Sequence, residues 1–269
     1  MLDTPIVMGI LNVTPDSFYD GGQYAAVDTA LEQAEQMLTE GASIIDVGGM
    51  SSRPGADIIS VEEELQRVIP VIEAVKKQFP DAIISIDTVQ SEVARASVQA
   101  GASIINDISA GRIDDKMYAT VADLKNVPYI LMHMQGKPQD MQTKPSYEDV
   151  ALEILDFFIA EVGKLRELGV YDVVLDAGFG FGKSIAHNYE LLRKMHTFQI
   201  LDLPVLAGIS RKSMIYKLLD ITPAASLNAT SALHMVALQQ GAKILRVHDV
   251  KPAREVIRLW QQLELKEDF

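Results

Sequence analysis

Gly41-Ala42-Ser43-Ile44-Ile45-Asp46 is the stretch that decides the fold, because close variants of it recur along the chain. The variants are Gly101-Ala102-Ser103-Ile104-Ile105-Asn106, Gly169-Val170-Tyr171-Asp172-Val173-Val174 and Gly241-Ala242-Lys243-Ile244-Leu245-Arg246. In each, glycine suits the position just after a helix, where φ is positive, and a short apolar strand follows. The repeat is too loose for a stacked solenoid array. It predicts instead that helices and strands alternate.

Short apolar runs continue this rhythm over the whole chain. They are near-continuously apolar rather than alternating, which is typical of parallel strands buried on both faces. Segments of helical periodicity separate them, so the order is βαβα throughout. The predicted strands are Ile6 to Leu11, Ser43 to Ile45, Ala82 to Ile86, Ser103 to Ile105, Tyr129 to Met132, Asp172 to Leu175, Pro204 to Ala207 and Lys243 to Leu245. Eight such units predict an α/β fold, a closed (β/α)8 TIM barrel.

Length and composition favour a single domain over residues 1–269. The chain is close to the ~250 residues typical of such a barrel, and no stretch is rich enough in proline, glycine or serine to be a linker. The longest irregular segment, about His133 to Tyr147, is predicted to be a functional loop after a strand.

The charge and the missing residue types exclude several classes of function. A formal net charge of −13 argues against general nucleic-acid binding, which needs a basic surface. The chain has no cysteine, and we recognise no secretory signal and no apolar span of ~20 residues. We therefore expect a cytoplasmic enzyme that acts on small molecules, with no nucleic-acid or membrane partner.

Polar residues end several of the predicted strands, where the active sites of such barrels lie. Asp87, Asn106 and Asp176 follow the third, fourth and sixth runs. Two carboxylates and an amide suit a flat, nitrogen-rich heterocycle, because a carboxylate accepts two parallel N–H bonds. The alternative is that they cap helices, for which Asp and Asn are preferred. For the three together we favour the ligand site.

Other loops after the strands offer ligands for anions and metals. Asn12 begins a long first loop and has an oxygen suited to Mg²⁺, although Thr14-Pro15-Asp16 is also an ordinary turn. Arg53, held between glycines and a proline, is either a phosphate ligand or a solvated surface charge.

The seventh and eighth units carry further cations. Ser210-Arg211-Lys212-Ser213 opens a helix with two cations beside it, a typical anion site. Arg246 and His248 share one face of the last strand and suit a diphosphate.

Gly178-Phe179-Gly180-Phe181-Gly182-Lys183-Ser184 resembles a phosphate-binding P-loop but lacks a glycine at Ala177. The helix after it is predicted to begin near His187 or Asn188, too late for that motif, so we do not expect a nucleotide site. The remaining histidines are predicted to be structural, namely His133, His187, His196 and His234.

The motifs together resemble the dihydropteroate synthase family over nearly the whole chain. They are Asn12-Val13-Thr14-Pro15-Asp16-Ser17-Phe18, Ser52-Arg53-Pro54-Gly55, Ser85-Ile86-Asp87-Thr88, Asn106-Asp107, Gly178-Phe179-Gly180-Phe181-Gly182-Lys183, Ser210-Arg211-Lys212-Ser213 and Arg246-Val247-His248-Asp249. Ala177 and Ser52 depart from the family's usual proline and threonine.

The resemblance implies an Mg²⁺-dependent transferase of folate biosynthesis that joins 6-hydroxymethyl-7,8-dihydropterin diphosphate to p-aminobenzoate. It implies catalytic residues Asp87, Asp176, Lys212, Arg246 and His248. By position, the pterin ligands are Asp87, Asn106, Asp176 and Lys212; the diphosphate ligands are Asn12, Arg53, Arg246 and His248; and the p-aminobenzoate ligands are Phe18, Ser52, Pro54, Phe181, Ser210 and Arg211, with Asn12 also binding the metal.

The resemblance also implies a homodimer and a site that sulfonamides occupy. Two alternatives share the pterin pocket: a methyltransferase domain that passes a methyl group to a corrinoid partner, and a non-catalytic pterin-binding paralogue. Methyl transfer has no evident use for Arg53, Ser210-Arg211-Lys212 and Arg246-Val247-His248. A paralogue would be expected to lack Asn12 or the basic cluster. Asp46 fits none of these roles, and we predict that it supports the second loop.

Overall fold

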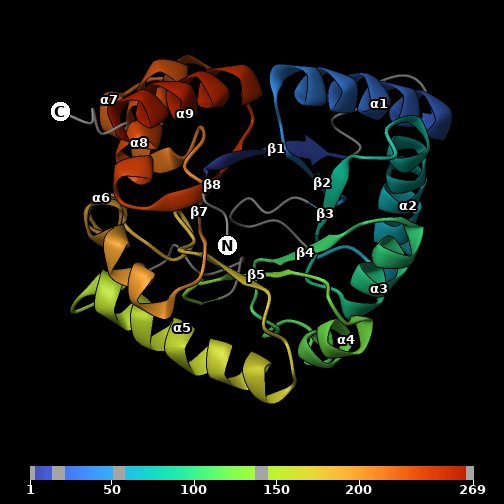
Figure 1. The fold of residues 1–269 in the computed structure, drawn as a ribbon, viewed down its shortest axis with the longest axis horizontal. Coiled ribbons are helices and arrows are strands. Elements are labelled where there is room, and N and C mark those ends of the chain that lie inside the picture. Colours follow the sequence, from blue (N-terminus) through green and yellow to red (C-terminus); the bar gives the residue numbers. More distant parts are fainter. Residues whose placement is uncertain (1–3, 14–21, 51–57, 137–144, 265–269) are drawn as a thin grey trace.

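The barrel was analysed in a computed structural model, which describes residues 4–13, 22–50, 58–136 and 145–264. Eight parallel strands close into a barrel in the order of the sequence (Figure 1). The strands are β1 (Ile6–Asn12), β2 (Ile44–Gly48), β3 (Ile83–Asp87), β4 (Ile104–Asp107), β5 (Tyr129–Met132), β6 (Val173–Asp176), β7 (Val205–Ala207) and β8 (Ala242–Val247). The predicted (β/α)8 TIM barrel is confirmed.

Helices surround the barrel on all sides in Figure 1. In the described part of the chain they are α1 (Gly22–Glu40), α2 (Val61–Gln78), α3 (Ser91–Ala100), α4 (Met117–Leu124), α5 (Val150–Glu167), α6 (Ile185–Lys194), α7 (Ser213–Leu219), α8 (Leu227–Gln239) and α9 (Val250–Glu264), with 3-10 turns η2 (Met195–Leu201) and η3 (Ala224–Ser226). The repeated glycines Gly41, Gly101, Gly169 and Gly241 all have positive φ, as predicted. None of the described helices is long and apolar enough to cross a membrane.

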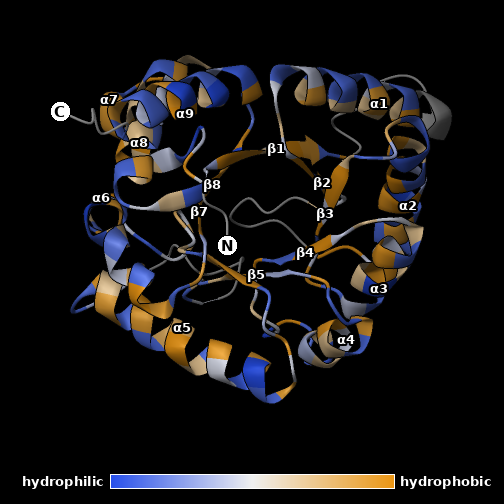
Figure 2. Cartoon of the chain, viewed as in Figure 1, coloured by the Kyte–Doolittle hydropathy of each residue, from blue (hydrophilic) through white to orange (hydrophobic). Residues whose placement is uncertain are grey.

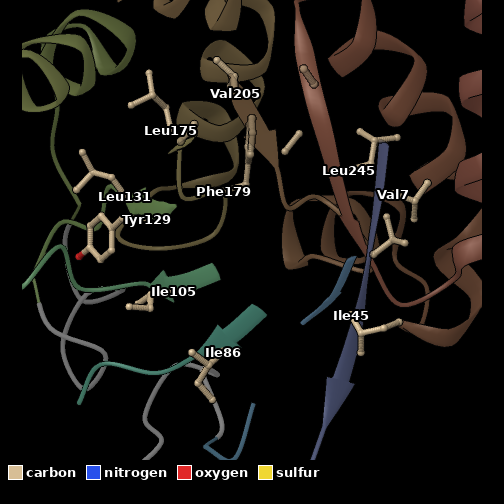
Figure 3. Close-up of a cluster of buried hydrophobic side chains, with 14 of the residues drawn as sticks. Val7, Ile45, Ile86, Ile105, Tyr129, Leu131, Leu175, Phe179, Val205 and Leu245 are labelled. Carbon is tan, nitrogen blue, oxygen red and sulfur yellow. The ribbon is translucent and has the colours of Figure 1, made fainter. Parts of the chain in front are cut away.

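The apolar core has three parts. The largest fills the space between the barrel and the helices, where side chains such as Leu175 and Val205 point away from the barrel interior (Figure 3). Figure 2 accordingly shows helices that carry both hydrophobic and hydrophilic residues around apolar strands. A second part plugs the barrel interior, and a third contributes to the pocket lining. The second consists of Met8, Ile44, Ile130, Leu206 and Ile244, and the third of Val89, Ile108, Met132, Met134 and Phe181. The barrel is therefore packed rather than open. Only the layer nearest the carboxyl ends of the strands, here called the upper layer, is available for polar groups.

Strand register decides which polar residues meet. Asp87 pairs with Asn106 across β3 and β4, and Asp46 pairs with Ser85 across β2 and β3. Because alternate residues of a strand point to the same side, these residues lie above the apolar plug on the inner face. Since all eight strands are parallel, their carboxyl ends open at one mouth of the barrel.

Candidate active site

Asp46, Asp87 and Arg246 form a charged layer across the upper barrel. The Nε–H of Arg246 donates to Asp46 Oδ2 at 2.6 Å, and its NH2 group donates to Asp87 Oδ2 at 2.5 Å. Asp46 is fully buried. The prediction that Asp46 supports the second loop is therefore wrong, because β2 continues two residues beyond it to Gly48 and places its side chain inside the barrel.

Asn106 joins this layer through the same aspartate. Its Nδ2–H donates to Asp46 Oδ2 at 3.0 Å, while its Oδ1 is buried and receives no hydrogen bond from the described residues. A buried acceptor left unpaired costs free energy unless a ligand supplies the donor. Asn106 lines the pocket at the barrel mouth and is therefore set to accept from a bound molecule.

Asp176 is the last residue of β6 and shapes the loop that follows it. Its Oδ1 accepts from the Gly178 backbone N–H at 2.8 Å. This local bond is the turn-forming role that aspartate often takes after a strand. Burial raises the pKa of Asp176, while the Gly178 bond, Lys212 and Arg246 oppose that shift. Asp176 also lines the pocket, so its carboxylate both stabilises the loop and is available to a ligand.

Lys183 secures the glycine-rich loop from within. Its buried Nζ donates to the backbone oxygens of Gly178 at 2.9 Å and Phe181 at 3.1 Å, and it lies 3.0 Å from Nδ1 of His133. The helix α6 begins at Ile185, two or three residues earlier than predicted, with Ser184 as its N-cap. The lysine therefore holds the loop rather than a phosphate, which agrees with the rejection of the P-loop.

Asn188 and the remaining histidines also serve the scaffold. Asn188 Oδ1 accepts from Gly180 N at 2.7 Å, a contact that sequence reasoning missed. His187 completes the capping box of α6, and burial lowers the pKa of His133 to about 2 and of His234 to about 4. His196 Nδ1 lies 2.6 Å from a Gln240 side chain, outside the pocket lining.

Lys212 forms the opposite wall of the pocket. Its Nζ lies 4.3 Å from the centroid of the Phe181 ring, a cation–π contact. Burial lowers the pKa of Lys212 to about 8, and Arg246 lowers it further while Asp176 and Asp87 oppose the shift. The pocket is closed by Ile108, Met132, Phe179 and Phe181. A flat ring would thus lie among apolar side chains with charged groups at its edge.

The pKa of Asp87 is raised to about 7, chiefly by burial, although Arg246 counteracts this. The carboxyl group is thus near the point where it gains or loses a proton at neutral pH.

Asp107, the residue after Asn106, is also buried, but it accepts from Ser109, Gly111 and Tyr129 and so stabilises the fourth loop. The sequence analysis assigned Asn106 to the ligand and gave Asp107 no role in the site.

Asn12 and Asp87 both lie beside Gly48, which has no side chain. A Cβ added to Gly48 would lie 3.8 Å from Asn12 Oδ1 and 3.8 Å from Asp87 Oδ2. The glycine therefore leaves a space that two oxygen donors border. Oxygen ligands of this kind suit Mg²⁺, which also shares its coordination shell with waters and substrate phosphates.

Ser210 and His248 contact each other at the β7 and β8 ends. Ser210 Oγ accepts from the His248 backbone N–H at 3.2 Å and lies 3.1 Å from its Nδ1. Burial, followed by Arg246, lowers the pKa of His248 to about 4, so its ring is neutral at pH 7. If Ser210 donates its hydroxyl proton to Nδ1, the ring keeps its own proton on Nε2, which can donate to a ligand.

One of the two cations predicted beside α7 is held in an ion pair. The Arg211 guanidinium donates to both carboxylate oxygens of Asp249, at 2.9 and 2.5 Å. This two-pronged ion pair neutralises its charge and joins the seventh and eighth loops. Arg211 can therefore offer a ligand its backbone more readily than its side chain.

The structure brings together the predicted Asp87, Asn106, Asp176, Phe181, Lys212 and Arg246 at one pocket or directly beside it. Four predicted site residues lie outside the described residues, namely Phe18, Ser52, Arg53 and Pro54.

The model of a family described as pterin binding enzyme matches residues 8–248. The chain belongs to this family.

Members of the pterin-binding family resemble the chain closely. Dihydropteroate synthase of Escherichia coli strain K12 is 48% identical over 260 residues, which cover 96% of this chain and 91% of that protein. A crystal structure of Yersinia pestis dihydropteroate synthase with a sulfonamide drug complex is 43% identical, with a TM-score of 0.92 over 98% of this chain and 95% of that one. Xanthomonas albilineans dihydropteroate synthase with 4-aminobenzoic acid matches at 43% identity and a TM-score of 0.92, over 99% and 95% of the two chains.

Proposed function

We propose that the chain joins 6-hydroxymethyl-7,8-dihydropterin diphosphate to p-aminobenzoate, giving 7,8-dihydropteroate and diphosphate in folate biosynthesis. The observation that carries this proposal is the pocket itself, where the acceptors Asn106 and Asp176 face the cations Lys212 and Arg246. An acidic chain with such a local cationic edge suits a substrate whose ring donates hydrogen bonds and whose tail is anionic. The dihydropteroate synthases that the chain matches along nearly its full length support the same reaction.

The pterin ring would be held at its nitrogen-rich edge. Asp176 and Asn106 Oδ1 accept N–H bonds from the ring and its amino group, while Asp87 accepts on the neighbouring strand. Lys212 donates to a ring oxygen or nitrogen from the opposite side. The apolar residues Met132 and Phe181 would cover the ring faces. These contacts would fix the ring and its exocyclic methylene for the reaction.

The diphosphate would lie above Arg246, near His248. We assign Arg53, which lies outside the described residues, to the same group on the sequence alone. The Arg246 guanidinium is fixed by carboxylates, so its charge is in place before the substrate arrives. A preorganised cation of this kind stabilises the negative charge that develops on the leaving group.

Asn12 would bind Mg²⁺ together with oxygens of the diphosphate, since side-chain oxygens of Asn12 and Asp87 border the space over Gly48. When bound, the ion supplies positive charge that stabilises the departing diphosphate. Asp87 borders the same space and is close enough to sense the ion's charge.

The p-aminobenzoate site would lie beside the pterin pocket. We assign to it Phe181, Ser210 and the backbone of Arg211, together with Phe18, Ser52 and Pro54 of the first two loops. Arg211 has a positive φ of 54°, which turns the loop before α7. A relative bound to 4-aminobenzoic acid and another in a sulfonamide drug complex support an aryl site of this kind.

The reaction would proceed by departure and capture at the exocyclic methylene. The C–O bond to the diphosphate breaks, and the electron-rich ring held by Asp87 and Asp176 carries the developing positive charge. The amine of p-aminobenzoate then forms the new C–N bond and releases a proton to solvent. No strong general base is needed, because this amine is neutral at pH 7.

We also propose that the chain forms a homodimer through its barrel helices. Leu218 and Leu219 of α7 are half exposed or more, as a helix face in an interface would be in the single chain. Light scattering would give about twice the 29.6 kDa of one chain. The cytoplasmic location stays a prediction, which fractionation of cells would test.

The experiment that tests the reaction offers the protein two chemistries in parallel. One mixture holds the pterin diphosphate, Mg²⁺ and p-aminobenzoate, and the other holds methyltetrahydrofolate with a reduced corrinoid. We expect dihydropteroate in the first and no methylcorrinoid in the second. Methyl transfer without dihydropteroate would favour the methyltransferase reading, and pterin binding with neither product would favour a non-catalytic paralogue.

A further inference from the structure

Asp46 is a buried carboxylate that none of the roles above requires. It lies in the middle of β2, its side chain is 0% exposed, and the described residues surround it on the inner face of the barrel. Burial of a charge is costly unless hydrogen bonds and an opposite charge accompany it. Oδ2 of Asp46 has both, whereas its Oδ1 is buried without a partner among the described residues. The two partners of Oδ2 are residues that we place at the ligand.

The first partner is Arg246. Asp46 and Asp87 bind different nitrogens of its guanidinium group. Asp46 takes the Nε–H at 2.6 Å, whereas Asp87 takes a terminal N–H at 2.5 Å. Asp87 is partly exposed at the end of its strand. When it accepts hydrogen bonds from a ring, its bond to Arg246 should weaken. Asp46 is 0% exposed and is not among the described residues that line the pocket, so we expect its hold on Arg246 to persist when the hold of Asp87 weakens.

The second partner is Asn106, whose amide Asp46 orients. A carboxylate only accepts, so the Asn106 group that faces it at 3.0 Å has to be Nδ2. The opposite atom, Oδ1, is then buried without a partner and presented as an acceptor. With the amide reversed, two oxygens would face each other, and the pocket would meet a donor instead.

We propose that Asp46 is a positioning residue that gives Asn106 its acceptor orientation and keeps Arg246 in place while Asp87 engages the ring. Asp46 itself touches no substrate. This inference rests on the proposed function, since it assumes a pterin ring as donor and a diphosphate near Arg246. The new element is that recognition of the ring and recognition of the diphosphate both depend on Asp46, which lies below the two residues that bind them.

The test uses Asp46→Asn, which keeps the shape and removes the charge. The control is Ser85→Ala, because Ser85 pairs with Asp46 in the sheet, is equally buried, and its Oγ has no partner among the described residues. We expect Asp46→Asn to weaken binding of a pterin without diphosphate at least about tenfold, and to raise KM for the pterin diphosphate similarly. KM for p-aminobenzoate and the affinities of Ser85→Ala should stay within about twofold.

Combining the substitution with Asn106→Ala and with Arg246→Ala separates positioning from general damage to the barrel. If Asp46 acts through Asn106, the loss of pterin affinity caused by Asp46→Asn should be at least about threefold smaller when Asn106→Ala is already present. If it also acts through Arg246, the rise in KM for the pterin diphosphate should be at least about threefold smaller when Arg246→Ala is already present. An undiminished penalty in both backgrounds would overturn the inference. Wild-type affinities in Asp46→Asn would also overturn it.

A measurement on the wild-type protein does not depend on whether any variant folds. We expect the Arg246 Nε–H proton, observed by NMR, to remain protected from exchange when pterin is bound. Exchange as fast as that of a free arginine would contradict the role of Asp46. If wild-type protein binds no pterin, the proposed function fails instead, and the two failures are thus distinct.

Discussion

Single residues in the pocket have protonation states that their neighbours set. Asp87 and Lys212 both have pKa values displaced toward neutrality by burial, to about 7 and about 8. Each is useful to a pterin in its charged form, one as an acceptor and the other as a cationic donor. Recognition should therefore depend on pH within a narrow window.

The affinity for a pterin without diphosphate should be greatest between about pH 7 and pH 8. Below that window Asp87 gains a proton and stops accepting two bonds, and above it Lys212 loses its charge. A probe without phosphate avoids titration of the substrate tail. Titration of ligand fluorescence from pH 5.5 to 9.5 measures the profile.

In Lys212→Met the decline at high pH should disappear while the decline at low pH remains. A flat profile in the wild-type protein would show that these two groups do not govern binding.

Asp176→Asn should raise the dissociation constant for pterin at least roughly 30-fold, because mismatching a buried charge-assisted pair costs ~2–5 kcal/mol. The new amide oxygen can still accept from Gly178 N, so the loop is expected to keep its turn. Asp172→Asn is the control, since Asp172 lies just before the same strand and is exposed. Calorimetry should find Asp172→Asn unchanged, and pterin affinity of wild-type strength in Asp176→Asn would remove Asp176 from the site.

At the scale of elements, the loop between β6 and α6 is the most tightly determined part of the site. Lys183, Asn188 and Asp176 each hydrogen bond to its backbone, and Gly178 lies against the oxygen of His133. This framework holds Phe181 beneath Lys212. The loop acts as a rigid wall of the pocket.

Gly178→Ala should distort that wall. A Cβ there would lie 1.9 Å from the His133 backbone oxygen, and the φ of +66° is already unfavourable for alanine. We expect a loss of stability of at least ~1 kcal/mol and weaker pterin binding. Gly163→Ala in α5 is the matched control, because no atom lies within 4 Å of its new Cβ, and it should stabilise by ~0.5–1 kcal/mol. Denaturant unfolding compares the two, and equal stabilisation would contradict the account.

The elements themselves follow from local sequence, but some contacts between them do not. Each predicted strand is found, usually with its ends shifted by one to three residues, and Tyr129–Met132 has the predicted bounds. The shift at β2 decided the error on Asp46, because apolar periodicity stops at the polar residue while backbone pairing continues to Gly48. The ion pair of Arg211 was not predicted for a different reason: its partner Asp249 lies 38 residues away on another loop.

Lys183 and Asn188 show a further limit. Both lie within or beside the glycine-rich motif, yet nothing in the spacing says that a lysine turns back onto its own loop. Lys183 is only 3% exposed because the fold of the loop directs backbone oxygens toward it. The signal in the sequence is a glycine-rich loop that is followed by a lysine and departs from the P-loop pattern at Ala177.

At the scale of the whole molecule, the closed barrel brings groups from distant strands to one layer. Asp46 and Arg246 are 200 residues apart in sequence and 2.6 Å apart in space. Ligand binding should therefore stabilise the molecule as a unit. At 100 times its dissociation constant, a ligand adds ~2.7 kcal/mol, which raises Tm by about 5–10 °C for a chain of this size.

Thermal unfolding with and without pterin measures this shift. Asp176→Asn at the same ligand concentration should show at most about a third of it, because a roughly 30-fold weaker ligand at this concentration adds only ~0.9 kcal/mol. Asp172→Asn should show all of it. A full shift in Asp176→Asn would mean that the ligand binds elsewhere.

The reaction itself is the central claim, and the balance of its two products tests it most directly. Purified protein is incubated with the pterin diphosphate and Mg²⁺, with and without p-aminobenzoate, and dihydropteroate and diphosphate are measured in the same samples. We predict equal amounts of both products with p-aminobenzoate present, and little of either without it. Diphosphate released without matching dihydropteroate, or no product in either mixture, would contradict the account.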